Sequence, residues 1–350
     1  MKAILLILPV FILAFVLTPA QTKAQTSGNN TFEFLSLTNS ARIAALGGNM
    51  ASMRDKDLSL ALPNPSLISP EMNNELAFSY VNYYTDINLG YAAYARSFKN
   101  LGTYTASLQF LDYGKFNYAD AAGATAGSFN VGDYSLNLGW GRNLDSNFSI
   151  GANLKLLYSD LEAYNSFGMA VDVAGSYFPD KNTCMSLVFA NVGRQITSYT
   201  SAGVQPLPFE IQLGVSRRLA HLPFRFSLLL QHLEKWDLTH LDASDAEIDP
   251  FTGQAVKKSS LDNFTDKAMR HIVLGGEFVP AKFLSFRFGY NYLRRQELKL
   301  DSRPGTAGFS WGIGLKISKF RIDYSRATYH LVGARNYVTL TTHLSDWVKQ

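Results

Sequence analysis

The chain has 350 residues, a formal net charge of +4, 13% aromatic residues and a mean hydropathy of −0.04. The nearly neutral charge gives no reason to propose a nucleic-acid partner, and the hydropathy argues against a bundle of membrane-spanning helices. The single cysteine, Cys184, excludes an intrachain disulfide framework. No base is identifiable beside Cys184, so we expect a buried, inert thiol rather than a catalytic one.

Residues 1–24 have the features of a secretory signal peptide. Lys2 is followed by an apolar run from Ala3 to Val16, and small residues surround the expected cleavage point after Ala24. A membrane-spanning helix is the alternative, but the run is short for a bilayer and contains Pro9. The sequence therefore predicts a cleaved signal and an exported protein.

Residues 25–74 differ in composition from the rest of the chain. We expect a short helix to begin near Thr38–Ser40 with Ser40 as its N-cap, and we expect breaks at Gly47-Gly48 and Asn64-Pro65. The apolar content of this stretch argues against a disordered leader. We therefore predict an N-terminal plug segment, packed inside or beneath the domain that follows, with Gly47, Gly48, Asn64 and Pro65 as structural positions.

From Glu75 onward the chain is predicted to form β-strands. Apolar residues occupy every second position in Phe309–Ile317, the chain turns at Ser318-Lys319, and the alternation resumes up to Tyr324. We count fourteen such segments, most of them about 9–12 residues long, close to the ~9–11 that a tilted strand needs to cross a bilayer. The predicted fold class is all-β: a transmembrane antiparallel β-barrel of about 14 strands in residues 75–350, with apolar rows facing lipid and small or polar rows facing the lumen.

The predicted connections alternate in length, as expected when short turns face the periplasm and longer loops face outward. Lys99–Leu101 and Ala281–Phe283 are examples of the short class. The long class includes Asp112–Gly132, Asp160–Asn165, Leu233–Arg270, Arg294–Ala307 and Thr328–Arg335. This alternation predicts an outer-membrane barrel in contact with outer-membrane lipid.

The sequence contains no convincing catalytic or metal-binding grouping. Its six histidines are scattered without zinc spacing, and no serine lies in a G-x-S-x-G setting. The acidic stretch from Asp237 to Asp249 could bind calcium, but it lacks the spacing of an EF-hand, and a solvated loop is the favoured interpretation. We therefore predict a non-enzymatic protein that needs neither a metal nor a cofactor; a barrel hydrolase is a distant alternative.

The predicted outer loop Leu293–Gly305 is rich in arginine. Arginine side chains suit the recognition of carboxylates and phosphates. One hypothesis is that Arg294, Arg295 and Arg303 contact an acidic partner or anionic lipopolysaccharide. The alternative is a solvated loop, because Glu297 and Asp301 lie between these cations.

Several motifs resemble those of a known family. SARIAALGGNM (Ser40–Met50), NPSL (Asn64–Leu67), PLPFEIQLGVSRRL (Pro206–Leu219) and the long stretch Gly289–Leu331 are similar to PorQ-like members of the PorV/PorQ group of FadL-like barrels, although Ser66 replaces the usual alanine. The resemblance implies a fourteen-stranded outer-membrane barrel with an N-terminal plug. It also implies a place in the type IX secretion system, beside a PorU-like sortase and a PorV-like barrel, holding a PorZ-like protein at the cell surface.

Two functions are carried forward from the sequence. The first, which depends on the resemblance, is an outer-membrane anchor within the type IX secretion and surface-attachment machinery. The second is a FadL-like carrier of small hydrophobic molecules, in which glycine-lined inner faces of the strands leave a passage through the barrel.

Overall fold

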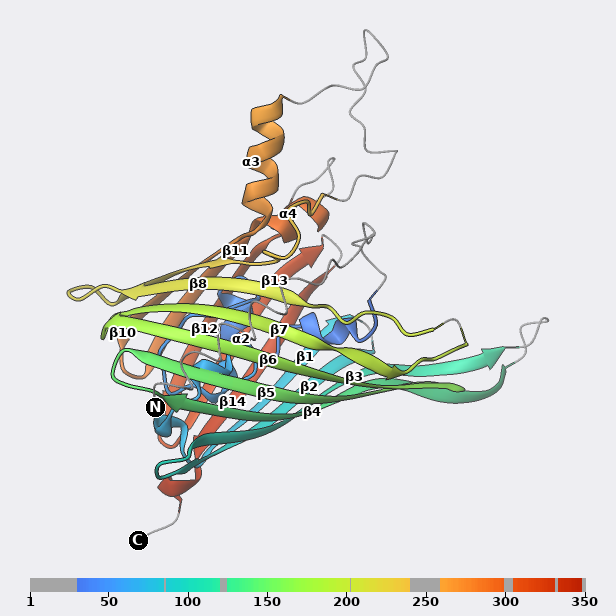
Figure 1. Cartoon of the computed structure of the whole chain (residues 1–350), viewed down its shortest axis with the longest axis horizontal. Helices are drawn as coiled ribbons and strands as arrows, with labels where there is room; N and C mark the ends of the chain where they lie inside the picture. Colours follow the sequence, from blue (N-terminus) through green and yellow to red (C-terminus); the bar gives the residue numbers. More distant parts are fainter. Residues whose placement is uncertain are drawn as a thin grey trace, which may run out of the picture.

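A computed structural model describes residues 30–84, 86–119, 125–201, 203–239, 259–298, 305–330 and 333–347. Within these ranges, fourteen antiparallel strands form a closed barrel (Figure 1). The strands are β1 (Glu75–Tyr84), β2 (Ile87–Phe98), β3 (Gly102–Ala119), β4 (Thr125–Asn143), β5 (Phe148–Leu161), β6 (Tyr164–Asp180), β7 (Thr183–Thr197), β8 (Glu210–Arg218), β9 (Phe224–Leu230), β10 (Ile272–Ala281), β11 (Leu284–Asn291), β12 (Phe309–Ile317), β13 (Phe320–His330) and β14 (Gly333–His343). The predicted fold class and strand number are confirmed.

The alternating sequence pattern sorts side chains between the two faces of the wall. In β12, Phe309 and Trp311 are exposed on the outside, whereas the alternate residues Ser310 and Gly312 are buried inside. Strand β5 alternates in the same way along nearly its whole length. Exposed apolar and aromatic side chains therefore cover the exterior, as a lipid-facing wall requires, and the predicted assignment of the two rows is confirmed.

The barrel closes where the last strand pairs with the first. β1 and β14 are aligned from Glu75 opposite His343 to Asn82 opposite Asn336 without a bulge. Inside the wall, the hydroxyl groups of Ser79 and Thr339 lie 2.8 Å apart across this seam. Closure satisfies the backbone groups that an open edge would leave unpaired in lipid.

Several of the predicted outer loops are strand or helix instead. Asp112–Gly132 and Thr328–Arg335 mostly continue the flanking strands, and Asp160–Asn165 is a tight turn between β5 and β6. These loop predictions were wrong because cross-strand contacts prolong the hairpins, as where Phe116 stacks on Phe129 at 5.6 Å.

Two of the long connections contain helices. Helix α3 (Ser260–Arg270) stands off the barrel, and helix α4 (Tyr292–Leu298) directly follows β11 within the predicted arginine-rich loop (Figure 1). Strand β11 therefore ends at Asn291, two residues before the predicted end. Among the described residues, no helix is long and apolar enough to cross a membrane.

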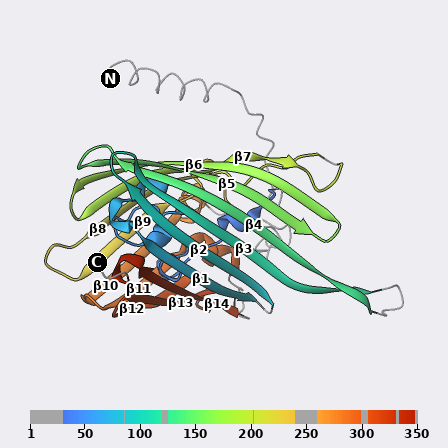
Figure 2. The ribbon, with the colours of Figure 1, turned by 90° about the horizontal axis from the view of Figure 1, so that it is seen from below.

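Residues 30–74, called the plug from here on, lie within the ring of strands (Figure 2). The plug consists of one short α-helix and four single turns of 3₁₀-helix: η1 (Glu33–Ser36), α2 (Ala41–Ala45), η2 (Leu58–Leu60), η3 (Pro65–Leu67) and η4 (Pro70–Met72). A fifth 3₁₀ turn, η5 (Leu344–Asp346), follows β14. The predicted signal peptide, Met1–Ala24, lies outside the described residues.

Candidate functional site

Helix α2 brings a buried arginine into the centre of the barrel. As predicted, Ser40 caps the helix, because its hydroxyl oxygen accepts a hydrogen bond from the Ile43 amide at 3.3 Å. The Ala41 amide donates to Thr339 Oγ1 of β14 at 2.9 Å, which joins the start of the helix to the wall. This placement directs Arg42, only 3% exposed, toward carboxylates of the plug and of the nearby strand β10.

Arg42 forms the hub of a buried ion network. Its guanidinium lies 2.7 Å from Asp55, 2.9 Å from Asp57 and 3.0 Å from Glu277 of β10. Burial alone would raise the pKa of Asp55, but Arg42 and neighbouring arginines outweigh it and hold that pKa well below its usual value. The network therefore ties the plug to the wall through fully charged groups.

Three wall arginines complete the network. Arg225 of β9 contacts Asp55 at 3.0 Å and Glu277 at 3.2 Å. Arg287 of β11 bridges Glu277 and Asp323, and Arg321 of β13 bridges Asp57 and Asp323. Four guanidiniums thus meet four carboxylates, so the charges of the network balance one another. Balanced pairing is what allows this many ionic groups to remain buried.

At several inward-facing glycines, plug atoms lie so close to the backbone of the wall that a side chain would not fit. A Cβ atom on Gly141 of β4 would lie 2.6 Å from Ile68, and one on Gly312 of β12 would lie 2.7 Å from Ala45, closer than real Cβ atoms approach. The same kind of approach occurs at Gly168 with Phe32, at Gly214 with Ser52 and at Gly289 with Gly47. At these positions, plug atoms occupy the space beside the inner glycines.

The plug positions singled out in the sequence lie at these points of contact. The Gly47 amide donates to Ser310 Oγ at 3.2 Å, and both Gly47 and Gly48 have positive φ, which glycine adopts readily. Asn64 caps η3 by accepting from the Ser66 amide at 2.9 Å. The Pro65 carbonyl oxygen lies against Gly141 and Gly151 of the wall.

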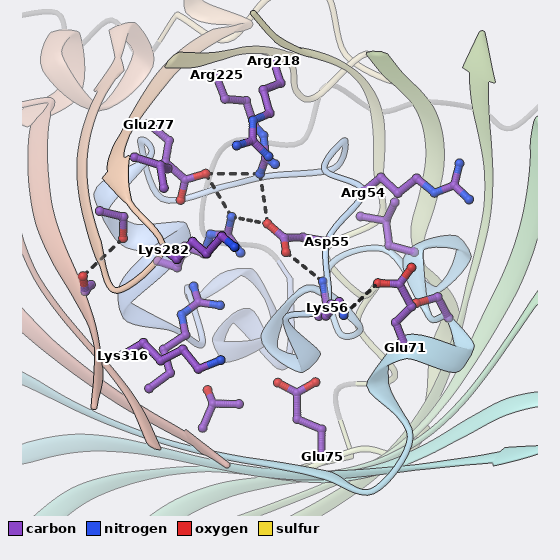
Figure 3. Close-up of a pocket in the computed structure, with 18 of the residues that line it drawn as sticks. Arg54, Asp55, Lys56, Glu71, Glu75, Arg218, Arg225, Glu277, Lys282 and Lys316 are labelled. Carbon is purple, nitrogen blue, oxygen red and sulfur yellow. Dashed lines mark hydrogen bonds and ion pairs between the residues drawn. The ribbon is translucent and has the colours of Figure 1, made fainter. Parts of the chain in front are cut away.

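A cavity of about 1140 Å³ lies between the plug and the short-turn end of the barrel. Its lining includes Asn147, Lys181, Lys282 and Lys319, which belong to four different short turns. Eleven basic and six acidic side chains line it. Figure 3 shows Arg218, Lys282 and Lys316 extending from the wall toward the network around Asp55. A cavity with this lining suits charged molecules, because an apolar solute would separate these groups from water.

The structure separates the two described arginines of the predicted partner site. Arg294 turns toward the lumen, where its guanidinium carbon lies 4.0 Å from the centroid of the Tyr329 ring and against Gly48 of the plug. Arg335 of β14 also lies on the Tyr329 ring, at 3.4 Å. Arg295 instead donates to the carbonyl oxygens of Gly305 and Ala307 at 3.2 and 3.1 Å, which fastens its own loop. The third arginine, Arg303, lies outside the described residues.

The remaining candidate groups show no metal-binding arrangement in the part of the chain that the structure describes. Asp237, the first acid of the possible calcium loop, pairs with Lys267 of α3 at 2.6 Å, and Asp242–Asp249 lie outside the described residues. Cys184 is buried, 2% exposed, in an apolar cluster with Phe178 and Leu67. This is the environment expected for an inert thiol.

Comparison with known proteins shows similarity of fold. No family model and no curated protein matches the chain. The toluene transporter TodX of Pseudomonas putida has 12% sequence identity, a TM-score of 0.53 and coverage of 87% of this chain and 96% of TodX. The toluene transporter TbuX of Ralstonia pickettii has 12% identity and a TM-score of 0.50, covering 88% of this chain and 97% of TbuX. The chain therefore has the closed-barrel fold of these two transporters.

Proposed function

We propose that this protein is a non-enzymatic outer-membrane barrel that anchors a surface protein within the type IX secretion and attachment machinery. The observation that carries the proposal is the seating of the plug. Inner glycines on opposite sides of the wall receive it, and a balanced network of buried charges fastens it. A barrel filled in this way is a rigid scaffold, and a scaffold can act through its surfaces without conducting anything.

Segments beyond the barrel wall offer surfaces for a partner. On α3, Leu261 is 73% exposed and Phe264 is 59% exposed, and Trp236 packs beside Phe264 with ring centroids 5.5 Å apart. The hairpin of β3 and β4 also presents Phe116 and Tyr118 to solvent. Exposed groups of large apolar side chains commonly mark sites of protein contact. Both segments belong to connections that the alternation of loop lengths assigns to the cell exterior.

The choice of partner depends on the sequence resemblance. The motifs of residues 40–67 and 289–331 are similar to those of PorQ-like proteins, and this similarity supports a PorZ-like protein as the anchored surface partner. A PorU-like sortase and a PorV-like barrel would then belong to the same assembly. Contact with lipopolysaccharide would be a secondary role of the outer loops.

Deletion of the protein tests the anchor function directly. We expect the PorZ-like protein to be shed into the medium while the uptake of hydrophobic solutes stays unchanged. Quantitative mass spectrometry of the surface proteome and of the medium measures the first result, and uptake of labelled toluene and fatty acids measures the second. An undisturbed surface proteome together with lost uptake would refute the anchor.

A paired set of α3 variants localises the contact. Leu261→Asp with Phe264→Asp should release the partner, because hot-spot side chains typically contribute about 2 kcal/mol or more to binding. The matched control, Ser260→Asp with Asn263→Asp, adds the same two charges to exposed positions of α3 without removing apolar surface. Heat-modifiable migration of both variants would show that the barrel still folds. Equal retention of the partner by both variants would exclude α3 as the contact.

A carrier of small hydrophobic molecules is the second candidate. The specific observation that favours it is the fold shared with TodX and TbuX, which are named as toluene transporters. Considered alone, the comparison of folds supports this candidate better than the anchor. The charged cavity and the glycines occupied by the plug weigh in the other direction.

A further inference from the structure

Charge is distributed unevenly within the cavity at the short-turn end. The network nearest the plug is balanced, with Arg42, Arg225, Arg287 and Arg321 paired to four carboxylates. The rim differs, because six basic side chains there form no ion pair with any carboxylate of the described chain: Arg54, Lys181, Arg218, Lys282, Lys316 and Lys319. These six are called the basic rim. Four acidic residues outside the network also line the cavity: Glu71 of η4, which pairs with Lys56, Glu75 at the start of β1, Asp180 at the end of β6 and Asp346 of η5.

The basic rim faces the lumen rather than the surrounding lipid. Lys316 lies between Leu315 and Ile317 in β12, both exposed on the outer wall, so the alternation of the strand points Lys316 inward. Arg218 of β8 and Arg54 of the plug also line the cavity. Lipid headgroups lie outside the wall and cannot be the natural counterions of side chains that project into the barrel.

The cavity is large and open for a small ligand. Its volume of about 1140 Å³ exceeds the range of roughly 300–1,000 Å³ that is usual for small-molecule pockets. Three of its unpaired basic groups come from separate short turns, two from the ends of β8 and β12 and one from the plug, so they do not form one converging cluster. A positively lined cleft of this kind focuses its field on an extended anion and increases the rate of its capture.

We propose that the short-turn end of the barrel is a docking site for an acidic segment of a periplasmic polypeptide, held by the basic rim. The site lies at the opposite end from the proposed surface contact. It depends on the orientation with short turns in the periplasm and not on the identity of the surface partner. The protein would then be held from both sides of the membrane.

Binding of a fluorescein-labelled ten-residue glutamate peptide to the full-length, detergent-solubilised protein tests the proposal. We expect one peptide per barrel, with affinity falling as NaCl rises from 50 to 300 mM. Arg218→Gln with Lys282→Gln and Lys316→Gln should weaken binding at least tenfold. The control set Lys99→Gln, Arg142→Gln and Arg217→Gln removes the same charge from exposed positions near the same end that do not line the cavity, and it should change affinity less than twofold.

A second measurement keeps the test valid if the triple variant does not fold. Bound peptide should protect Lys282 and Lys316 of the unmodified protein from amine acetylation, whereas Lys99 should react equally with and without peptide. Equal peptide affinity in the two variant sets, or no protection of Lys282 and Lys316, would overturn the proposal. So would binding of phosphatidylglycerol vesicles or inorganic phosphate by the rim when the peptide does not bind, because the site would then recognise lipid or phosphate.

Discussion

Removal of the hub arginine should release the plug. Arg42 is 3% exposed and lies within 3.0 Å of three carboxylates, so Arg42→Met leaves one uncompensated negative charge inside the barrel while roughly preserving side-chain volume. Breaking a buried ion pair costs about 3–5 kcal/mol. Asp55 retains Arg225 at 3.0 Å and Asp57 retains Arg321 at 3.0 Å, so we expect the lower end, about 3 kcal/mol.

Limited proteolysis of the folded, solubilised barrel measures this cost. A loss of about 3 kcal/mol raises the population with a detached plug about 100-fold, and cleavage follows that population when reclosing is fast. Lys56→Met is the control. Lys56 is 68% exposed and forms only a weak surface ion pair with Glu71, at 3.7 Å, so its removal should not change the cleavage rate. Adding Glu277→Gln to Arg42→Met should restore much of the protection. A cleavage rate for Arg42→Met within twofold of the unmodified protein would refute the role of the network.

Three further predictions concern the barrel wall, the arginines Arg294 and Arg295 of α4, and the charge of His232. Ile313→Arg places a charge on the lipid-facing row, so it should destabilise membrane insertion by about 2–4 kcal/mol, measured as the heat-modifiable fraction. Asn153→Arg lies on the inner row and should still insert. It should instead expose the plug to protease, because Asn153 donates to the plug carbonyl of Ala61 at 3.1 Å. Arg294→Ala should increase cleavage of the plug, because Arg294 contacts Gly48, while Arg295→Ala should affect only cleavage of its own loop. Burial would lower the pKa of His232, but Glu210 and Glu234 raise it to about 9. The contacts made by the charged imidazole should therefore be intact below its usual pKa of about 6.5 and lost as pH rises through about 9. Faster hydrogen exchange of residues 231–239 at high pH should show this loss, and His232→Gln should abolish the pH dependence.

The barrel could be predicted from the sequence because its signal is local and repeated. An apolar row such as Phe309, Trp311 and Ile313 indicates which face of a strand meets lipid. The barrel closes when fourteen such strands pair in sequence and the last pairs with the first. The ends of the strands were less predictable. The hairpin of β3 and β4 extends beyond the predicted bounds because it is held by cross-strand pairs such as Phe116 with Phe129, and a single strand does not reveal its partner.

The interior could be predicted only in part, because its contacts join residues far apart in the chain. The position of Ser40 predicted the start of α2, and the alternation of β11 and β13 is enough to place Arg287 and Asp323 on inward-facing rows. Nothing local indicates that Arg42 meets Glu277, 235 positions away, or that Arg294 contacts the plug. A charge on a lumen-facing row is a useful signal, since burial requires a partner, but the partner must come from the structure.

The glycines of the inner wall distinguish the two functions most directly. If they receive the plug, a larger side chain must displace it and open the lumen; if they line a passage, the same side chain must narrow it. Gly141→Val and Gly289→Val should therefore increase single-channel conductance in planar bilayers and speed cleavage of the plug. Gly276→Val is the control, because a Cβ atom there would meet nothing within 4 Å. Reduced uptake of toluene by both variants, with the plug still protected, would favour the carrier.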